Sequence, residues 1–192
     1  MTNQENLKND IKNFLFEKNC EKTYFHCIMV GECAYKLGKN YLSEPNKARV
    51  AGYLHDISAI YPNEERIAIA NEYSIELNDA ERKFPMIIHQ KISKQIAIQN
   101  FGILDKEILS AIECHTTLKK NYSELDLVVF VADKIKWDQS GVPPYLNGLL
   151  KELDESLENA AYYYIEYILK NGVKVVHPWL WEAYIKLKNK LS

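Results

Sequence analysis

The stretch from Ala51 to Ile57 places a histidine beside an aspartate, His55-Asp56, at the end of an apolar helical run. A buried carboxylate is costly unless it meets a group of opposite charge, and a metal ion is the partner that also suits an adjacent imidazole. The fold therefore has to bring further ligands to this stretch from distant parts of the chain.

Length and composition favour a single helical domain. The chain has 192 residues, 47% of them hydrophobic and 26% charged, so it can bury one sizeable core. It holds only seven glycines and six prolines, too few for the many tight turns of an all-β fold. We predict an all-α protein with one domain over residues 1–192. Its core is expected at about 22–138, with C-terminal helices at 146–190 packed on it.

Charge and local hydropathy exclude several classes of partner. The net charge of −2 gives no basic surface of the kind that nucleic-acid binding requires. No apolar run approaches the roughly 20 residues that cross a bilayer. The N-terminal segment Met1–Lys8 lacks the apolar centre of an export signal. We therefore expect a cytoplasmic protein with no nucleic-acid or membrane partner.

Apolar residues recur at helical spacing along most of the chain. Ser43 is the expected N-cap of one helix, with Pro45 in its first turn. Ser123 and Asp126 have the spacing of a capping box at the start of another helix. The predicted helices cover 9–18, 22–37, 45–55, 64–73, 78–85, 86–101, 105–115, 124–137, 146–169 and 178–190.

Five residues on separate predicted helices share an unusual setting, because each is a ligand-type side chain with largely small or apolar neighbours three and four positions away. They are His26, His55, His89, His115 and Asp133. A single buried histidine more often bonds to a backbone carbonyl than binds a metal. Asp133 is harder to explain in that way, because an ionised carboxylate on an apolar helix face is costly unless paired. Together with the His55-Asp56 pair, the five indicate a metal site.

The order His, His-Asp, His, His, Asp resembles that of the HD-domain superfamily, whose members are all-α, metal-dependent phosphohydrolases. By this resemblance the first metal is held by His26, His55, Asp56 and Asp133. His89 and His115 stand at positions that complete a second metal or contact a substrate phosphate, so one or two ions are expected. Mixed imidazole and carboxylate ligands suit iron, manganese or zinc better than calcium.

Local motifs at 22–26, 51–57, 115–117, 132–135 and 176–184 extend this resemblance over nearly the whole chain. They resemble the YqeK family of bacterial symmetrical diadenosine tetraphosphate hydrolases, which use iron. The resemblance implies an iron-dependent hydrolase, with manganese or zinc as alternatives. It implies cleavage of diadenosine tetraphosphate to two ADP by attack of a metal-activated hydroxide on an inner phosphorus.

The same resemblance assigns roles to individual residues. Asp56, His89 and His115 are expected to be catalytic. Substrate contacts are expected from His26, Asp56, His89, His115, Thr116, Asp133 and Gln139. Where His89 or His115 is not bound to metal, its imidazolium form would bond to phosphate.

The chain departs from the family pattern mainly where basic residues are usual. The departures are Thr23, Ala59 and Gln139 in place of arginine or lysine, and Leu180 and Ile185 in place of threonine and asparagine. We expect Lys119, Lys134 or Lys136 to take over the phosphate contact.

Two other functions stay open. One keeps the metal and changes the substrate to a nucleoside monophosphate, guanosine tetraphosphate or a cyclic dinucleotide. The other is a nucleotide-binding module with very slow turnover. In each case the expected partner is a nucleotide, or ADP as product, and Tyr162-Tyr163-Tyr164 offers either internal packing or the face of a homodimer.

Overall fold

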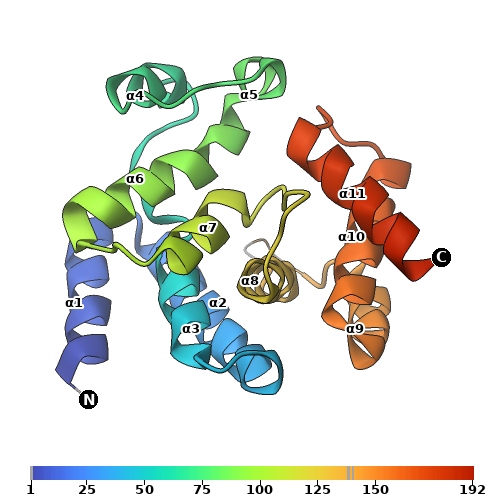
Figure 1. Ribbon diagram of the computed structural model, residues 1–192. Coiled ribbons are helices and arrows are strands. Elements are labelled where there is room, and N and C mark those ends of the chain that lie inside the picture. Colours follow the sequence, from blue (N-terminus) through green and yellow to red (C-terminus); the bar gives the residue numbers. More distant parts are fainter. Residues whose placement is uncertain (1, 138, 140) are drawn as a thin grey trace.

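The computed structural model describes residues 2–137, 139 and 141–192, with side chains described from Glu5 onward. This part of the chain forms eleven α-helices and two short 3-10 helices and contains no strand (Figure 1). The all-α prediction is therefore confirmed. The elements are α1 Thr2–Phe16, α2 Glu21–Tyr41, α3 Pro45–Leu54, η1 Ile57–Ile60, α4 Arg66–Glu72, α5 Asp79–Lys83, η2 Pro85–Ile88, α6 His89–Phe101, α7 Lys106–Cys114, α8 Glu124–Ile135, α9 Leu146–Glu155, α10 Leu157–Asn171 and α11 Pro178–Leu191.

Helix α8 is the centre of the molecule. It contacts α2, α3 and α7 on one side and α9 and α10 on the other (Figure 1). Every residue from Leu125 to Ala132 is buried, as expected for a helix that is apolar nearly all round. The predicted capping box starts this helix, because Asp126 N–H donates to Ser123 Oγ at 3.1 Å and Ser123 N–H donates to Asp126 Oδ2 at 2.9 Å.

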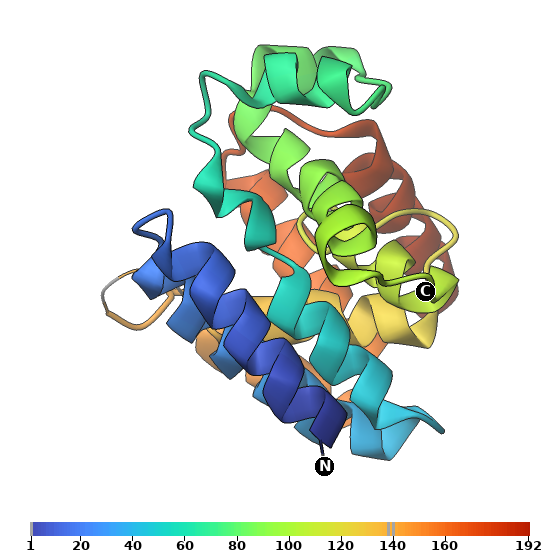
Figure 2. The ribbon, with the colours of Figure 1, turned by 90° about the vertical axis from the view of Figure 1, so that its left-hand side faces the viewer.

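Helices α2 and α3 approach each other very closely at two glycines. A Cβ atom placed on Gly52 would lie 2.6 Å from the Cα of Gly31, so neither position has room for a side chain. This contact brings the middle of α2 beside the C-terminal end of α3, where His55 lies. Figure 2 shows α1 on the outside of this helix pair, alongside α2 and α3.

The start of α3 differs from the prediction in one detail. Pro45 is in the first turn as expected, but the N-cap is Glu44, whose side chain makes no capping hydrogen bond. Ser43 therefore is not the cap. The backbone at Glu44 adopts φ −123° and ψ 71°, which a residue before proline favours because the α region is disfavoured there.

The predicted helix over 146–169 is wrong, because the chain breaks at Ser156 into α9 and α10. Ser156 is extended, with φ −167° and ψ 163°, and its Oγ accepts the N–H of Asn159 at 3.0 Å. A serine that caps a new helix satisfies an amide that would otherwise lack a partner. The apolar periodicity continues across the break because both helices face α8.

Two other predicted helices are shorter than expected. The segment from Pro85 to Ile88 is a 3-10 helix, and α6 begins at His89. Helix α8 ends at Ile135, so Trp137 lies beyond it. Across the described residues, no helix has the length and hydropathy needed to span a bilayer.

Candidate metal centre

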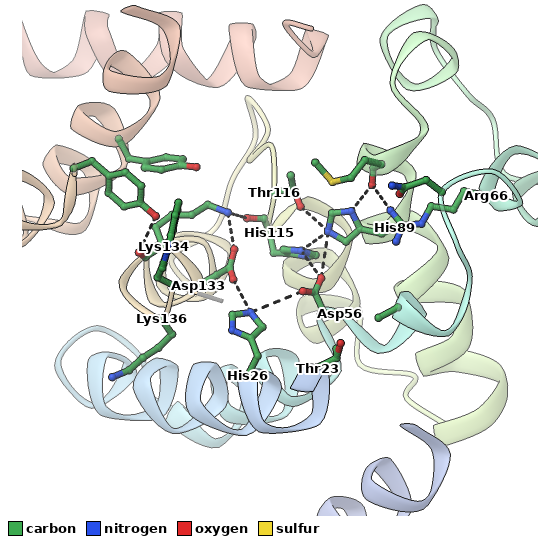
Figure 3. Close-up of a pocket in the computed structure, with 16 residues that line it drawn as sticks. Thr23, His26, Asp56, Arg66, His89, His115, Thr116, Asp133, Lys134 and Lys136 are labelled. Carbon is green, nitrogen blue, oxygen red and sulfur yellow. Dashed lines mark hydrogen bonds and ion pairs between the residues drawn. The ribbon is translucent and has the colours of Figure 1, made fainter. Parts of the chain in front are cut away.

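Six side chains from five helical regions meet at one place beside α8. Figure 3 shows all of them except His55. They are His26 within α2, His55 at the end of α3, Asp56 next to it, His89 at the start of α6, His115 at the end of α7 and Asp133 within α8. All four histidines are buried. The structure thus brings together every ligand-type residue that the sequence singled out, although three of the histidines lie at helix ends rather than within helices.

Those helix ends orient the imidazole rings. The Nδ1 atoms of His55, His89 and His115 lie 2.7, 2.6 and 2.9 Å from the backbone oxygens three residues earlier. A carbonyl oxygen only accepts, so each Nδ1 carries a proton, and in the neutral form of each ring Nε2 presents a lone pair. A hydrogen bond of this kind to the outer nitrogen is typical of metal-bound histidines.

The lone pairs converge on one another. His26 Nε2 lies 3.1 Å from His55 Nε2, and His89 Nε2 lies 2.9 Å from His115 Nε2. Burial lowers the pKa of His115 to about 4, with the Asp56 carboxylate acting in the opposite direction, so this imidazole is neutral near pH 7. Two unprotonated nitrogens at such distances repel each other unless a cation lies between them.

Asp56 lies between the two histidine pairs. Its Oδ1 is 3.2 Å from His89 Nε2 and 3.3 Å from His115 Nε2. Its Oδ2 is 3.5 Å from His55 Nε2 and 3.8 Å from His26 Nε2. Oδ1 is buried and no hydrogen-bond donor in the described residues reaches it. The carboxylate therefore faces lone pairs on both sides.

Asp133 closes the cluster from α8. Its Oδ1 lies 3.2 Å from His26 Nε2 and 3.4 Å from His55 Nε2. Its Oδ2 accepts a hydrogen bond from Lys134 Nζ at 2.6 Å. Burial raises the pKa of this carboxyl, but the Lys134 ammonium and the nearby imidazoles outweigh burial and hold the pKa well below its usual range. Asp133 is thus an anion.

The donor set fits a divalent cation. Three overlapping groups each offer ligand atoms within 4.8 Å of one another, and Asp56 belongs to two of them. They are His26-His55-Asp56, His55-His115-Asp133 and Asp56-His89-His115. Imidazole nitrogens mixed with carboxylate oxygens suit iron, manganese or zinc. The cluster is able to hold a metal ion.

Metal binding is expected to stabilise the fold. Adding Fe²⁺ or Mn²⁺ to chelator-treated protein at about 100 times the dissociation constant contributes about 2.7 kcal/mol of stability. For a chain of this size that corresponds to a rise in Tm of about 5–10 °C, measurable by differential scanning fluorimetry. Asp133→Asn should lose most of the rise, and an equal rise in that variant would contradict a site at this cluster.

A cavity of about 450 Å³ opens directly onto the cluster and gives a ligand access to it. Thr116 lines it, with Oγ1 3.0 Å from His89 Nε2, and Lys136 lines it from the end of α8. Gln139 is exposed and is not among the lining residues. Lys119 does not reach the cavity either, because its Nζ lies 3.5 Å from Asp126 on the far end of α8.

A second cavity of about 390 Å³ adjoins the first and is largely apolar. Lining residues common to both are Met86, Thr116, Trp137, Tyr145 and Tyr164. The second cavity extends from there between Phe84, Ile168 and Leu180, and is closed by the segment before α11. A ligand with charged groups at the cluster has an aromatic compartment next to them.

Several cavity residues were not foreseen from the sequence. Arg66 follows two glutamates and looks like the solvated start of a helix, yet it lines the cavity of the cluster. Tyr145 and Tyr164 look like ordinary packing residues, and no local pattern distinguishes them. All three reach the site through the packing of helices that are distant in sequence.

An all-α fold that gathers four histidines and two aspartates at one point defines a class of metal-binding helical proteins. Within that class the sequence matches the HD-domain profile over residues 23–138. This match covers more than half of the chain. The chain belongs to the HD-domain family of hydrolases, as the resemblance predicted.

Two bacterial proteins are similar to this chain in sequence. A protein from the pepC 5′ region of Lactococcus lactis subsp. cremoris is 53% identical over 153 residues, which are 80% of this chain and 78% of that protein. A symmetrical bis(5′-nucleosyl)-tetraphosphatase of Staphylococcus aureus is 32% identical over 120 residues, or 62% of this chain and 61% of that protein. The match thus spans less than two thirds of the tetraphosphatase.

A solved structure is also similar. A predicted HD superfamily hydrolase involved in NAD metabolism, from Clostridium acetobutylicum, superimposes with a TM-score of 0.84 and 29% identity. The alignment covers 95% of this chain and 97% of that one. The two proteins therefore share their arrangement of helices along nearly their whole length.

Proposed function

We propose that the protein hydrolyses dinucleoside tetraphosphates and cleaves diadenosine tetraphosphate symmetrically to two ADP. The observation that carries the proposal is the set of convergent imidazole lone pairs around Asp56, at the floor of a cavity that continues into an aromatic compartment. The relatives described as symmetrical tetraphosphatases support the choice of substrate. Iron is the proposed metal, with manganese or zinc as alternatives.

The proposed ligands are His26, His55, Asp56 and Asp133, completed by His89 and His115 where a second ion binds. A divalent ion there would polarise a phosphoryl oxygen and lower the pKa of a bound water. Asp56, in the middle of the cluster, is placed to orient the attacking group. Thr116 Oγ1, beside His89 Nε2, is placed to donate to a phosphate oxygen.

The aromatic compartment is proposed to hold one nucleobase. Tyr145 and Tyr164 stand at the junction of the two cavities, with ring centroids 4.9 Å apart. Aromatic rings give stacking surfaces for any base, and stacking contributes about 1–3 kcal/mol per base in nucleic-acid complexes. A base bound there has its phosphates directed at the cluster, because the cavities share that junction.

Product analysis tests the proposal directly. The protein is loaded with Fe²⁺ without oxygen, incubated with diadenosine tetraphosphate, and the products are separated by ion-exchange chromatography. We expect two ADP per substrate consumed and no ATP or AMP. The same assay with a nucleoside monophosphate, guanosine tetraphosphate and a cyclic dinucleotide should show slower turnover of each.

Three results would overturn this function. Formation of ATP with AMP means that an outer phosphate is attacked and cleavage is not symmetrical. Faster turnover of another nucleotide in the panel would mean that this nucleotide class is the substrate. No turnover of any of them would mean that the protein binds nucleotides without hydrolysing them.

A further inference from the structure

The cavity at the cluster contains a guanidinium group that none of the roles above uses. We propose that Arg66, with Lys136 on the opposite rim, binds the phosphates on either side of the one that lies at the cluster. This inference rests on the proposed function only for the class of ligand, a linear polyphosphate. In this proposal, Arg66 and Lys136 make the site prefer ligands with several phosphates over ligands with one.

Arg66 is held directly beside the cluster. Its Nη1 donates to the backbone oxygen of Met86 at 2.8 Å, and the same oxygen accepts from His89 Nδ1 at 2.6 Å. One carbonyl therefore links the guanidinium to an imidazole of the cluster. A second bond, from Nε to the backbone oxygen of Tyr61 at 3.4 Å, holds the inner part of the side chain.

The guanidinium keeps both charge and donors available for a ligand. Its two bonds go to neutral carbonyls, and no carboxylate among the described residues lies within ion-pair distance of it. Burial lowers the pKa of Arg66, with Asp56 acting in the opposite direction, but an arginine stays protonated at any physiological pH. The Nη2 donors have no bond to the described part of the chain, and a planar guanidinium matches a phosphate with two parallel hydrogen bonds.

Lys136 supplies the second positive charge. It caps the end of α8, lines the same cavity and has no ion pair with the described residues. Lys134 is different, because its ammonium is neutralised by Asp133 at 2.6 Å. Figure 3 shows Arg66 and Lys136 on opposite sides of the cluster, with the Lys136 ammonium turned away from it, so the lysine side chain has to turn inward to meet a phosphate.

Two neutral residues lie at positions where a cation could have contacted a phosphate. Thr23 and Ala59 border the cavity near the cluster and carry no charge. The cations that face a polyphosphate therefore come from the start of α4 and the end of α8. Because each lies to one side of the cluster, a single phosphate at the cluster gains little from them and a triphosphate gains from both.

Calorimetric titration of phosphates of different length tests this. Inorganic monophosphate and triphosphate are titrated into the Mn²⁺-loaded protein, with the same free Mn²⁺ in cell and syringe. Arg66→Met should weaken triphosphate binding about 10-fold or more, the effect of losing a charge-assisted hydrogen bond, and monophosphate binding less than about 3-fold. Lys136→Met should act in the same direction, and the salt dependence of triphosphate binding should fall in both.

Matched variants separate binding from folding. Arg66→Lys retains the charge and should recover part of the lost triphosphate affinity, which a purely structural role of Arg66 would not predict. An unchanged triphosphate affinity in Arg66→Met, or equal losses for both phosphates, would overturn the inference. If the wild-type protein does not hydrolyse diadenosine tetraphosphate but its triphosphate binding depends on Arg66, the proposed function is wrong and this inference still holds.

Discussion

Replacing Asp56 by alanine is expected to lower kcat/KM for nucleotide hydrolysis at least about 1,000-fold, equivalent to about 4 kcal/mol of transition-state stabilisation. Asp56 is the carboxylate that lies within 3.8 Å of all four imidazole Nε2 atoms, so its loss affects both halves of the cluster. Elemental analysis of the purified variant should show less than about half of the wild-type metal content, since a carboxylate shared by two positions contributes to both.

Two further variants test whether the effect comes from the loss of a ligand oxygen at Asp56. Asp56→Asn keeps the shape of the side chain but replaces one ligand oxygen by an amide nitrogen that has no lone pair to offer, so it should fail nearly as badly. Asp154→Ala, an exposed aspartate on α9, should keep full activity and metal content. Circular dichroism should show the same helix content in all three variants, because Asp56 makes no hydrogen bond that holds a helix.

Activity within about 10-fold of wild type in Asp56→Ala would contradict a catalytic role for the cluster. Full metal content with lost activity would give a narrower result, in which the metal is held by the remaining ligands and Asp56 acts only on the attacking group. The two measurements together therefore distinguish a ligand from an orienting residue.

Much of the site was predictable because ligand-type residues on apolar helix faces are rare. His26 and Asp133 were recognisable from their apolar neighbours, and in the structure His26 Nε2 lies 3.2 Å from Asp133 Oδ1. The capping box of Ser123 with Asp126 was equally recognisable, since its spacing is read directly from the sequence. These features depend on residues that are close together in the sequence, so they can be recognised without knowing the tertiary structure.

Features that depend on tertiary packing were not predictable. The break at Ser156 keeps the apolar periodicity on both sides, so the sequence resembles one continuous helix. Arg66 lies 23 residues before His89 and reaches it only because η2 folds back against α4. The close approach at Gly31 and Gly52 also left no local signal beyond two glycines in helical segments.

The second large effect is expected at a buried ion cluster outside the metal centre. Glu81 in α5 is fully buried and lies 2.9 Å from Lys91 Nζ of α6 and 3.3 Å from His177 Nε2. The N–H of Trp179 donates to His177 Nδ1 at 3.1 Å, and His177 Nε2 lies 3.3 Å from Glu81 Oε1 and 2.9 Å from the side-chain amide nitrogen of Asn78. The cluster ties the start of α11 to α5 and α6.

Glu81→Ala is expected to destabilise the protein by about 3–5 kcal/mol, because it leaves the Lys91 ammonium buried without its anion. Chemical denaturation followed by circular dichroism measures this. Glu72→Ala, at an exposed position at the end of α4, should change the free energy of unfolding by less than about 0.5 kcal/mol. A loss of less than about 1 kcal/mol in Glu81→Ala would show that the charges are solvated.

The effect should depend on pH. Burial raises the pKa of Glu81, but His177 and Lys91 outweigh burial and hold the pKa below its usual value. A carboxyl with a depressed pKa contributes stability above its unfolded-state pKa and loses it as the pH falls. The difference between wild type and Glu81→Ala should therefore be full at pH 7 and shrink below about pH 4.5.

The ion cluster of Glu81, Lys91 and His177 also borders the apolar cavity that is proposed to hold a nucleobase. His177 and Leu180 form one wall of the apolar cavity beside the metal centre, and Glu81 is what anchors that wall. If the cavity holds a nucleobase, Glu81→Ala should raise KM for diadenosine tetraphosphate more than it lowers kcat, because the side chain of Glu81 bonds to Asn78, Lys91 and His177 and to none of the metal-centre residues. An equal fall in kcat with unchanged KM would mean that the segment before α11 does not touch the substrate.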